Sequence, residues 1–342
     1  MEKNSGNNNK LVPQVSSKRA TSYDVARLAG VSQSAVSRCF KTGASVSVKT
    51  REKVRKAADE LGYQPNAIAR GLITRRSNIV AVVITEFTTL NYPEMTSRLN
   101  EHLAKHDIHI LLFTVGPQSD MTVVLDQIWQ YQVDGIIASA PFSEAEIQRC
   151  AKRGIPLVFY NRICNDSAVS TVGCDHAEGV KILIDRLVRD GAKRFVVLSG
   201  PDDSAVARER LRGATEQIEL HRLSMSVLGG DYTYESGVRL TQQVIDGSSL
   251  PDAFVCANDV MAIACIDTLR GADLAVPEDV KVVGFDGITV GQWHAYQLTT
   301  IEQPLDRMIE ATVSMLLERI EDITLPAEKR LFAGKYIDGA SA

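Results

Sequence analysis

The chain reads SYDVARLAGVSQSAVSR over residues 22–38, and this stretch decides what its N-terminal part can be. Val25, Ala26 and Ala29 recur with helical spacing, which gives a first short helix one apolar face. Gly30 follows, and glycine readily adopts the backbone angles that a tight turn requires. The stretch therefore predicts a short helix, capped by Thr21 or Ser22, that ends in a tight turn.

A second helix is expected directly after the turn. Ser32 can cap it, and Val36 with Cys39 or Phe40 would face inward. The outward-facing residues would then be Gln33, Ser34, Ser37 and Arg38. Small and polar side chains at the start of such a helix can approach base edges in the major groove of DNA. The pattern therefore indicates a helix-turn-helix.

A third helix is predicted from Val48 to Leu61, capped by Ser47. Its inward residues would be Val54, Ala57, Ala58 and Leu61. Its first turns carry basic side chains, Lys49, Arg51 and Lys53, where DNA phosphates would pass. Three short helices of this kind also occur in small bundles that bind other proteins, and the pattern alone leaves that alternative open.

The charge distribution favours nucleic acid as the partner of this helical head. Between Lys18 and Arg76 there are 13 Lys and Arg residues against four Asp and Glu, a net charge of +9. The whole chain carries −4 and residues 1–17 carry +1, so residues 77–342 carry −14. A basic head on an acidic body is typical of a DNA-binding module joined to a domain with another task.

The segment Pro65-Asn66-Ala67-Ile68-Ala69-Arg70-Gly71-Leu72 follows the third helix. It is too short to be a stable helix alone, so we expect it to become ordered only on DNA and beside a partner copy. An apolar side chain inserted between base steps costs a few kcal/mol of unstacking and allows the bent DNA to contact more protein. The segment is therefore predicted to be a hinge helix that acts as a switch.

Length and composition fit a multidomain soluble protein. The 342 residues suit two or three domains, and no apolar run reaches the roughly 18 residues that a membrane span needs. The Asn-rich start is expected to be a disordered tail and not a secretory signal, so we expect a cytoplasmic protein without membrane contact. The six cysteines form no C-x-x-C pair, so reduced thiols, no metal and no cofactor are expected.

After Arg76 short apolar runs alternate with amphipathic helical patterns. The predicted strands are 79–84, 108–113, 135–138, 157–160, 195–198, 253–257 and 280–285, with a last strand pattern over 330–337. Helical patterns lie between them, for example 95–105, 178–190, 236–246 and 260–270. Such alternation predicts parallel sheets covered by helices, and this many units indicate two doubly wound subdomains. No nucleotide-binding, hydrolase or zinc-protease motif is present, which argues against an enzyme.

Polar residues follow several of these strands, where ligands of doubly wound sheets bind. Arg210 comes after a strand and a Gly-Pro turn, Asn258 follows one strand directly, and Asp286 ends another. A guanidinium, an amide and a carboxylate suit a neutral ligand rich in hydroxyl groups. Each residue has a plainer reading: a surface ion pair for Arg210, a helix cap for Asn258 and a turn for Asp286.

The head resembles the lactose-repressor/galactose-repressor (LacI/GalR) family. The matching motifs are Tyr23-Asp24-Val25-Ala26, Ala29-Gly30-Val31-Ser32, Val36-Ser37-Arg38, Thr50-Arg51-Glu52-Lys53-Val54 and Leu61-Gly62-Tyr63-x-Pro65-Asn66. By this resemblance Gln33, Ser34 and Arg38 read bases, 66–72 is the hinge helix, and Leu72 enters the minor groove beside Ala69. The expected DNA-contacting set is Ser22, Tyr23, Ser32, Gln33, Ser34, Ser37, Arg38, Asn66, Ala69 and Leu72. Cys39-Phe40-Lys41 departs from the family pattern, which affects the preferred DNA sequence.

The body is similar to the periplasmic-binding-protein-like core of the same family. The matching motifs are Val172-x-x-Asp175, Arg210-x-x-Gly213, Ala257-Asn258-Asp259-x-Met261-Ala262, Val282-Val283-Gly284-Phe285-Asp286 and Leu298-Thr299-Thr300-Ile301-x-Gln303-Pro304. The residues that this resemblance places at an effector are Phe87, Tyr92, Asp175, Arg210, Tyr232, Asn258 and Asp286. Gly287 stands where a second aspartate is common.

The resemblance implies a transcriptional regulator, which we expect to be a repressor. It would bind a palindromic operator as a homodimer and respond to a small, sugar-like effector. The expected parts are a tail (1–20), an all-α helix-turn-helix head (21–64), a hinge helix (65–75) and an α/β core (76–342). Within the core, the first subdomain would hold 78–174 and 303–325, and the second 175–302 and 326–342. A sugar-binding transport protein is the alternative, but it would need an export signal and no basic head.

Overall fold

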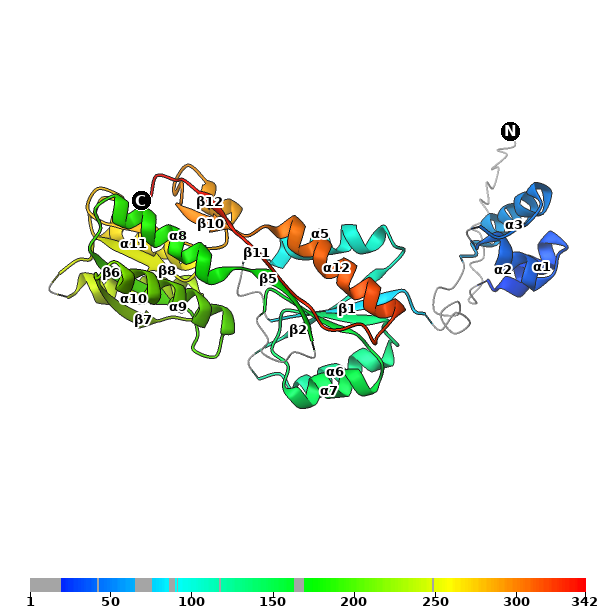
Figure 1. Cartoon of the computed structure of the whole chain (residues 1–342). Helices are drawn as coiled ribbons and strands as arrows, with labels where there is room; N and C mark the ends of the chain where they lie inside the picture. The colour runs from blue at the N-terminus through cyan, green and yellow to red at the C-terminus, as the bar shows by residue number, and fades with distance from the viewer. Residues whose placement is uncertain are drawn as a thin grey trace, which may run out of the picture. The chain divides into compact units, whose positions relative to one another are not determined.

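The computed structural model describes residues 20–41, 43–64, 76–85, 90, 92–116, 118–162, 169–247 and 249–342, which are coloured in Figure 1. The chain divides into two compact units, Met1–Arg75 and Arg76–Ala342. The expected hinge helix and the first 19 residues lie outside the described residues.

The first unit contains three helices, α1 (Ser22–Ala29), α2 (Gln33–Cys39) and α3 (Val48–Leu61). Their apolar faces enclose a small core of Val25, Ala26, Val36, Cys39, Val54, Ala57 and Ala58. The three helices and their caps were predicted correctly, but the inward placement of Leu61 is wrong, since it is 38% exposed. The chain reverses at Gly62 (φ 61°), and Tyr63 packs on the core instead, with its ring edge-on to Phe40.

The second unit holds a six-stranded and a four-stranded sheet in which all strands are parallel. The order in the first sheet is β11 (Lys329–Phe332), β5 (Ser170–Cys174), β4 (Leu157–Tyr160), β3 (Gly135–Ala138), β1 (Ile79–Thr85) and β2 (His109–Val115). The order in the second is β7 (Ser224–Gly229), β6 (Arg194–Ser199), β8 (Ala253–Cys256) and β9 (Lys281–Val283). Both orders reverse direction beside the first strand of the sheet, which confirms the predicted doubly wound subdomains.

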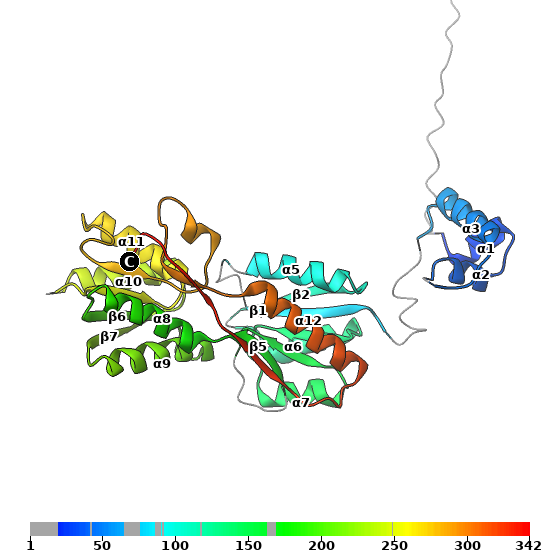
Figure 2. The ribbon, with the colours of Figure 1, turned by 45° about the horizontal axis from the view of Figure 1, so that its top comes forward.

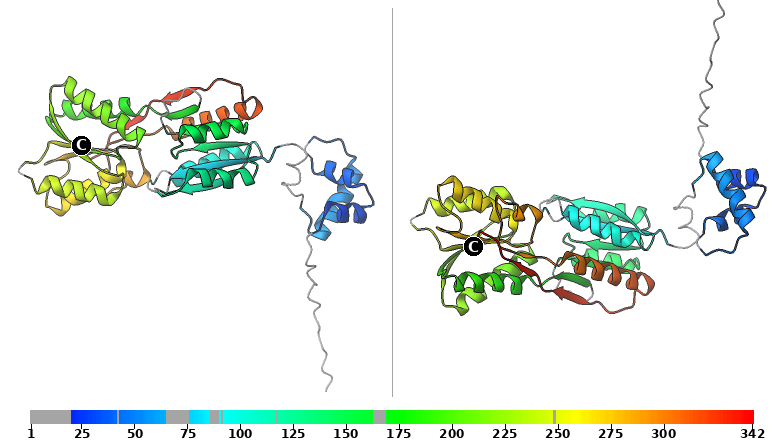
Figure 3. Two further views of the ribbon diagram at one scale, coloured as in Figure 1. Left: turned by 90° about the horizontal axis from the view of Figure 1, so that it is seen from below. Right: turned by 90° about the horizontal axis from the view of Figure 1, so that it is seen from above.

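Helices cover both faces of each sheet. Helices α5 (Tyr92–Ala104) and α12 (Leu305–Glu321) lie side by side on one face of the first sheet (Figure 2), and the opposite face packs on α6 (Met121–Gln130) and α7 (Glu144–Lys152). Around the second sheet, α8 (His176–Arg189) and α9 (Ala205–Leu220) lie opposite α10 (Tyr234–Ile245) and α11 (Asp259–Gly271), as Figure 3 shows. The α5/α12 and α8/α9 faces share one apolar cluster, so the two subdomains have a common core.

The chain passes between the subdomains at three places: from β5 to α8, from β10 (Thr300–Glu302) to α12, and from β11 to β12 (Lys335–Ile337). The last crossing corrects the sequence analysis, which read residues 330–337 as one strand and assigned 326–342 to the second subdomain. Strand β11 instead pairs with β5 in the first sheet, whereas β12 pairs antiparallel with β10. Gly334 lies between them, where a Cβ atom would meet Ile301 at 2.3 Å.

Candidate functional site

The helix-turn-helix is held by local caps. Thr21 and Asp24 form a capping box: the Thr21 hydroxyl accepts from the Asp24 N–H at 3.3 Å, and the Asp24 carboxylate accepts from the Thr21 N–H at 3.0 Å. The Thr21 hydroxyl also donates to the Asp24 carboxylate at 2.7 Å; this bond, and then the one from the Thr21 N–H, hold the pKa of Asp24 below its usual value. Gly30 ends α1 with a left-handed φ of 65°, and the Ser32 hydroxyl caps α2 by accepting from the Ala35 N–H at 3.2 Å. Local caps therefore set where α1 begins, where it ends and where α2 begins.

The predicted base-reading residues lie on the face of α2 that points away from the head core. Ser34, Ser37 and Arg38 are exposed, and Gln33 is half-buried. The Gln33 side-chain amide donates to the Ser22 hydroxyl at 3.3 Å, so the starts of α1 and α2 are joined. Tyr23 beside it is 68% exposed. The structure thus brings the predicted residues of α1 and α2 to one accessible surface, while Asn66, Ala69 and Leu72 lie outside the described residues.

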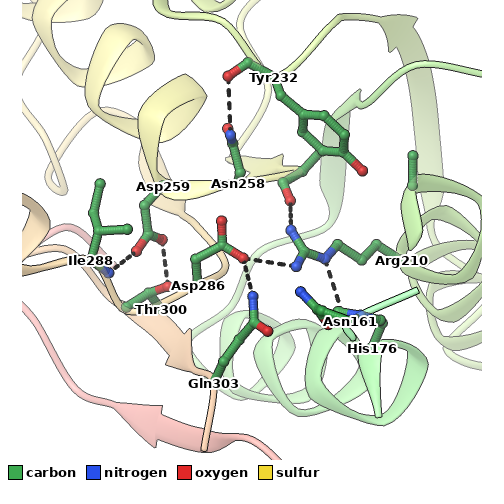
Figure 4. A network of polar contacts seen from close by, with 12 residues as sticks. Asn161, His176, Arg210, Tyr232, Asn258, Asp259, Asp286, Ile288, Thr300 and Gln303 are labelled. Atoms are coloured by element: carbon green, nitrogen blue, oxygen red, sulfur yellow. Dashed lines mark hydrogen bonds and ion pairs between the residues drawn. The ribbon is translucent and has the colours of Figure 1, made fainter. Parts of the chain in front are cut away.

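Arg210 is the centre of a polar network in the second unit (Figure 4). Its side chain is 5% exposed, so the alternative of a surface ion pair is wrong. The guanidinium donates to the Asp286 carboxylate at 2.8 Å, to the Ala257 carbonyl, and through Nε to Nδ1 of His176 at 3.3 Å. It also stacks on the Phe285 ring, with 3.9 Å between Cζ and the ring centroid. Arg210 is therefore held in one position by four neighbours.

Asp286 occupies a strained turn at the carboxyl end of the second sheet. Its φ is 128°, which few residues other than glycine adopt. Its Oδ1 accepts both from Arg210 and from the Gln303 side-chain amide, the latter at 2.6 Å. Gly287 follows with φ 73°, and a Cβ atom there would lie 2.5 Å from the Glu302 backbone. The geometry thus explains why this chain has glycine where a second aspartate was expected.

Two residues that the sequence analysis did not select, His176 and Asn161, extend the network into the first subdomain. Because arginine can only donate, Nδ1 of His176 accepts from Arg210, which leaves the proton on Nε2 to donate to Asn161 Oδ1 at 3.1 Å. Burial and then the positive charge of Arg210 lower the pKa of His176 well below its usual value, so the ring is neutral. Asn161 follows β4, His176 begins α8 and Gln303 lies before α12, so the network joins both subdomains and two crossings.

Asn258 and Tyr232 form the part of the network next to β8. The Asn258 carbonyl oxygen caps α11 by accepting from the Met261 N–H at 2.9 Å, which confirms its plainer reading as a cap. Its amide donates to the Tyr232 backbone carbonyl at 3.0 Å. The Tyr232 ring covers Gly200, where a Cβ atom would lie 2.5 Å away, and its hydroxyl contacts Ser204 at 3.2 Å. Asn258 therefore holds the Tyr232 backbone in position and also caps α11.

The remaining predicted effector residues are distributed unevenly. The Tyr92 hydroxyl contacts the Thr85 hydroxyl at 2.8 Å, at the carboxyl end of β1. The Asp175 carboxylate caps α8 by accepting from the Glu178 N–H at 3.2 Å, and among the described residues it forms no hydrogen bond with the Arg210 network. Phe87 lies outside the described residues. Tyr92 thus lies at the carboxyl end of β1, and the Asp175 side chain stabilises the start of α8.

Asp259 supports the turn that carries Asp286. Its side chain is fully buried and accepts from the Thr300 hydroxyl and, at 2.8 Å, from the Ile288 N–H. Burial, and then the charge of Asp286, raise the pKa of Asp259 to about 7. The sequence motif contained this residue, but its contacts with positions 288 and 300 depend on the tertiary fold.

A cavity of about 320 Å³ lies beside the network, between the two subdomains of the second unit. Its lining includes Tyr160 and Asn161 from the first subdomain, Asp286 and Gly287 from the second, and Gln303 from a crossing. This volume is at the lower end of the roughly 300–1,000 Å³ of small-molecule sites. The described residues contain no group of three or more His, Cys, Asp or Glu that could hold a metal ion, and none of their helices is long and apolar enough to cross a membrane.

Both units match families of known proteins. A family model described as bacterial regulatory proteins, lacI family, matches residues 21–66, and one described as a periplasmic binding protein-like domain matches residues 184–342. The HTH-type transcriptional regulator CelR of Thermobifida fusca is 32% identical over 314 residues, which cover 89% of this chain and 92% of CelR. The HTH-type transcriptional repressor PurR of Vibrio atlanticus (strain LGP32) is 29% identical over 319 residues, covering 92% of this chain and 95% of PurR.

Solved structures of regulators from this family are also similar to the chain. The lac repressor dimer bound to operator and the anti-inducer ONPF is similar with a TM-score of 0.85 and 25% identity, over 95% of this chain and 99% of that one. A CelR–cellobiose complex is similar with a TM-score of 0.72 and 30% identity, over 95% of this chain and 100% of that one. The similarity therefore extends over the head and the core together, which a transport protein without a head would not give.

Proposed function

Because the chain belongs to the LacI family of transcriptional regulators, we propose that it represses transcription from a palindromic operator under the control of a small, sugar-like effector. The protein is a DNA-binding regulator and not an enzyme. Repression, the effector class and the homodimer are the parts of the proposal that need a test. A repressor acts on chromosomal DNA, so the proposal also places the protein in the bacterial cytoplasm.

The network around Arg210 carries the proposal of effector control. It contains residues of both subdomains together with His176 and Gln303, which lie at two of the three crossings. A ligand that exchanges hydrogen bonds with this network changes the relative free energies of two subdomain arrangements. Such coupling between two sites is typically worth about 1–3 kcal/mol, or 5- to 150-fold in affinity.

The sugar-like class is supported by the side chains at the cleft and by relatives. Guanidinium, carboxylate and amide groups bind hydroxyl groups, which both donate and accept. The CelR structure holds cellobiose. For this chain the sugar class and the choice between inducer and corepressor are tested by thermal-shift screening of saccharides, followed by DNA binding in the presence of each hit.

The homodimer fits a palindromic site, since two-fold symmetry in the protein matches two-fold symmetry in the DNA. The second subdomain also presents a contact surface of exposed aromatic side chains. Trp293 is 57% and Tyr234 39% exposed, Tyr296 is half-buried, and both tyrosine hydroxyls donate to the Asp267 carboxylate. We propose that these residues form part of the dimer contact; sedimentation of Trp293→Ser, which should show a larger monomer fraction than wild type, tests it.

DNA binding is tested by fluorescence anisotropy on fragments of genomic DNA at increasing salt. Binding should weaken steeply with salt, because Lys and Arg contacts to phosphate release counterions. Leu72→Ala should weaken binding to the selected operator far more than binding to random DNA, if Leu72 inserts between base pairs. Equal losses on both DNAs would refute the insertion, and salt-insensitive or absent binding would refute the operator proposal.

A further inference from the structure

Two carboxylates hold the chain at the point where it enters the core. Oδ1 of Asp134 accepts from the Ser77 N–H at 2.9 Å and from the Ser77 hydroxyl at 3.2 Å. Oδ2 of Asp134 accepts from the Asn78 N–H at 2.7 Å. Glu321 accepts from the Arg76 guanidinium, also at 2.7 Å. The first three residues of the core are therefore held by two separate elements before β1 begins.

Both carboxylates belong to regular elements of the first subdomain. The Asp134 N–H donates to the Ile79 carbonyl at 2.8 Å, and Gly135 directly after it begins β3, which pairs with β1. Glu321 is the last residue of α12, a helix of 17 residues that packs along β3, β4 and β5. Because these elements form part of one packed sheet and its cover, residues 76–78 move with the first subdomain as one body.

Negative charge at this place weakens attraction to DNA. In the proposed function Leu72 lies between base pairs, and four residues of extended chain span at most about 14 Å from Leu72 to Arg76. Carboxylates this close to phosphates oppose the contacts that Lys and Arg make with them. The pKa of Arg76 is raised, first by the hydrogen bond to Glu321, and the charges of Glu321 and Asp134 act in the same direction. A task in holding the chain explains why carboxylates occupy both positions.

We propose that Asp134 and Glu321 are positioning residues for operator binding: they fix the point and the direction in which the predicted hinge leaves the core. This inference rests on the proposed operator function and adds the residues that hold the base of the hinge. Specific binding requires both hinges of a dimer to reach one central base step, whereas random DNA is bound mainly through phosphates. Loss of either carboxylate should therefore weaken operator binding and leave binding to random DNA unchanged or tighter.

The test is fluorescence anisotropy of the full chain on the selected operator and on random DNA of equal length. Glu321→Gln keeps the size of the side chain and removes one negative charge from a residue that is 69% exposed, so folding should be unaffected. It should weaken operator binding by about threefold or more, while random DNA binds as tightly as to wild type or more tightly. Charge alone predicts tighter binding to both DNAs, so the two explanations differ in sign.

Glu318→Gln is the matched control. Glu318 is exposed in the same helix, three positions before Glu321, and its carboxylate accepts from the Ser314 hydroxyl at 2.6 Å. The substitution removes the same charge close to the same place without removing a hydrogen bond to residues 76–78. It should not weaken operator binding.

Asp134→Asn tests the second carboxylate. The introduced amide can accept from Ser77 but turns a donor toward the Asn78 N–H, so the pair of bonds cannot form. Hydrogen exchange of the Ser77 and Asn78 amides should accelerate. Operator binding should weaken by about tenfold or more, with less than about a twofold change on random DNA. Thermal unfolding of the core shows that the variant is folded.

The outcomes separate this inference from the proposed function. Operator affinity at or above the wild-type value would overturn the role of the substituted residue, and in both variants it would overturn the inference as a whole. An equal loss on operator and random DNA would do the same, since it shows a general effect on DNA binding. A wild-type chain that does not distinguish the selected operator from random DNA would instead refute the proposed function, and this inference with it.

Discussion

The recognition face of the head and the polar cleft of the core use similar side chains in opposite environments. In the head, Ser34, Ser37 and Arg38 are exposed on one helix and make few contacts with the rest of the protein. In the core, Arg210 and Asp286 are almost fully buried, and each is held by several neighbours from different elements. An exposed residue can be exchanged with little effect on folding, whereas a buried one serves folding and binding together.

The largest effect expected from this contrast is that of Arg210→Ala. Removing the guanidinium leaves the Asp286 carboxylate buried without its ionic partner, which typically costs about 3–5 kcal/mol of unfolding free energy. Urea unfolding of the full chain measures it. The control is Arg212→Ala in the same helix, whose ion pairs are half-exposed and screened by solvent, so little change is expected. Equal losses in both variants would mean that the Arg210 pair is no more important than a surface pair.

The pH dependence of stability should reveal Asp259. Its pKa is raised from 3.8 to about 7 in the folded chain, so the folded state binds the proton more readily than the unfolded state. Its contribution to the unfolding free energy is therefore greatest at low pH. The contribution falls as pH rises from 3.8 to about 7, by up to about 1.4 kcal/mol per pH unit. The difference between wild type and Asp259→Asn isolates this contribution from the other carboxyl groups. A difference that rises or stays constant between pH 4 and 7 would contradict the raised pKa.

Arg38→Ala should lower DNA affinity more than stability, whereas the main effect of Arg210→Ala is on stability. We expect a loss of about 1–3 kcal/mol in operator affinity, since a base contact is removed, with unfolding nearly unchanged. Lys53→Ala is the comparison, because Lys53 is exposed at the start of α3, where a phosphate contact is expected. It should weaken binding to all DNA sequences alike and lower the salt slope by about 1. Anisotropy on operator and random DNA separates the two, and a uniform loss for Arg38→Ala would exclude base reading.

The smallest effect expected is that of Ser32→Ala, which removes the cap of α2. Such a cap contributes about 1 kcal/mol to helix stability. The thermal unfolding of the head should therefore shift downward, while unfolding of the core should not. Ser37→Ala, on the exposed face of the same helix, should leave the unfolding of the head unchanged. If the two serine variants unfold alike, the cap has no stabilising role.

Local patterns predicted most of the fold. Strands 135–138 and 157–160 have the predicted bounds, because continuous apolar runs are typical of buried parallel strands. Strand β5 (Ser170–Cys174) was not predicted, since its sequence STVGC is short and half polar although all of it is buried. The edge strand β7 (Ser224–Gly229) was also missed, because it faces solvent and lacks an apolar run. Both strands were missed because burial depends on the place of a strand within its sheet, and the local sequence does not specify that place.

The candidate site was predicted in part. Arg210, Asn258 and Asp286 were found because they follow strands, where parallel sheets bind ligands. His176 and Tyr160 were missed, since a histidine after an aspartate and a tyrosine ending an apolar run have no distinctive pattern. Their meaning comes from contacts with residues 34 positions away in the first case and from the lining of a cavity in the second.

The sequence by itself determined the helical head, its caps and outward-facing residues, the alternation of strands and helices, and the resemblance to a family of regulators. These depend on spacing within about 20 residues, where periodicity and capping act directly. Only the tertiary structure decided that Arg210 is buried against Asp286, that His176 and Gln303 connect the subdomains, and that Tyr160 lines the cavity. The reason is physical: burial and pairing are properties of residues that are distant in sequence, and folding alone brings them together.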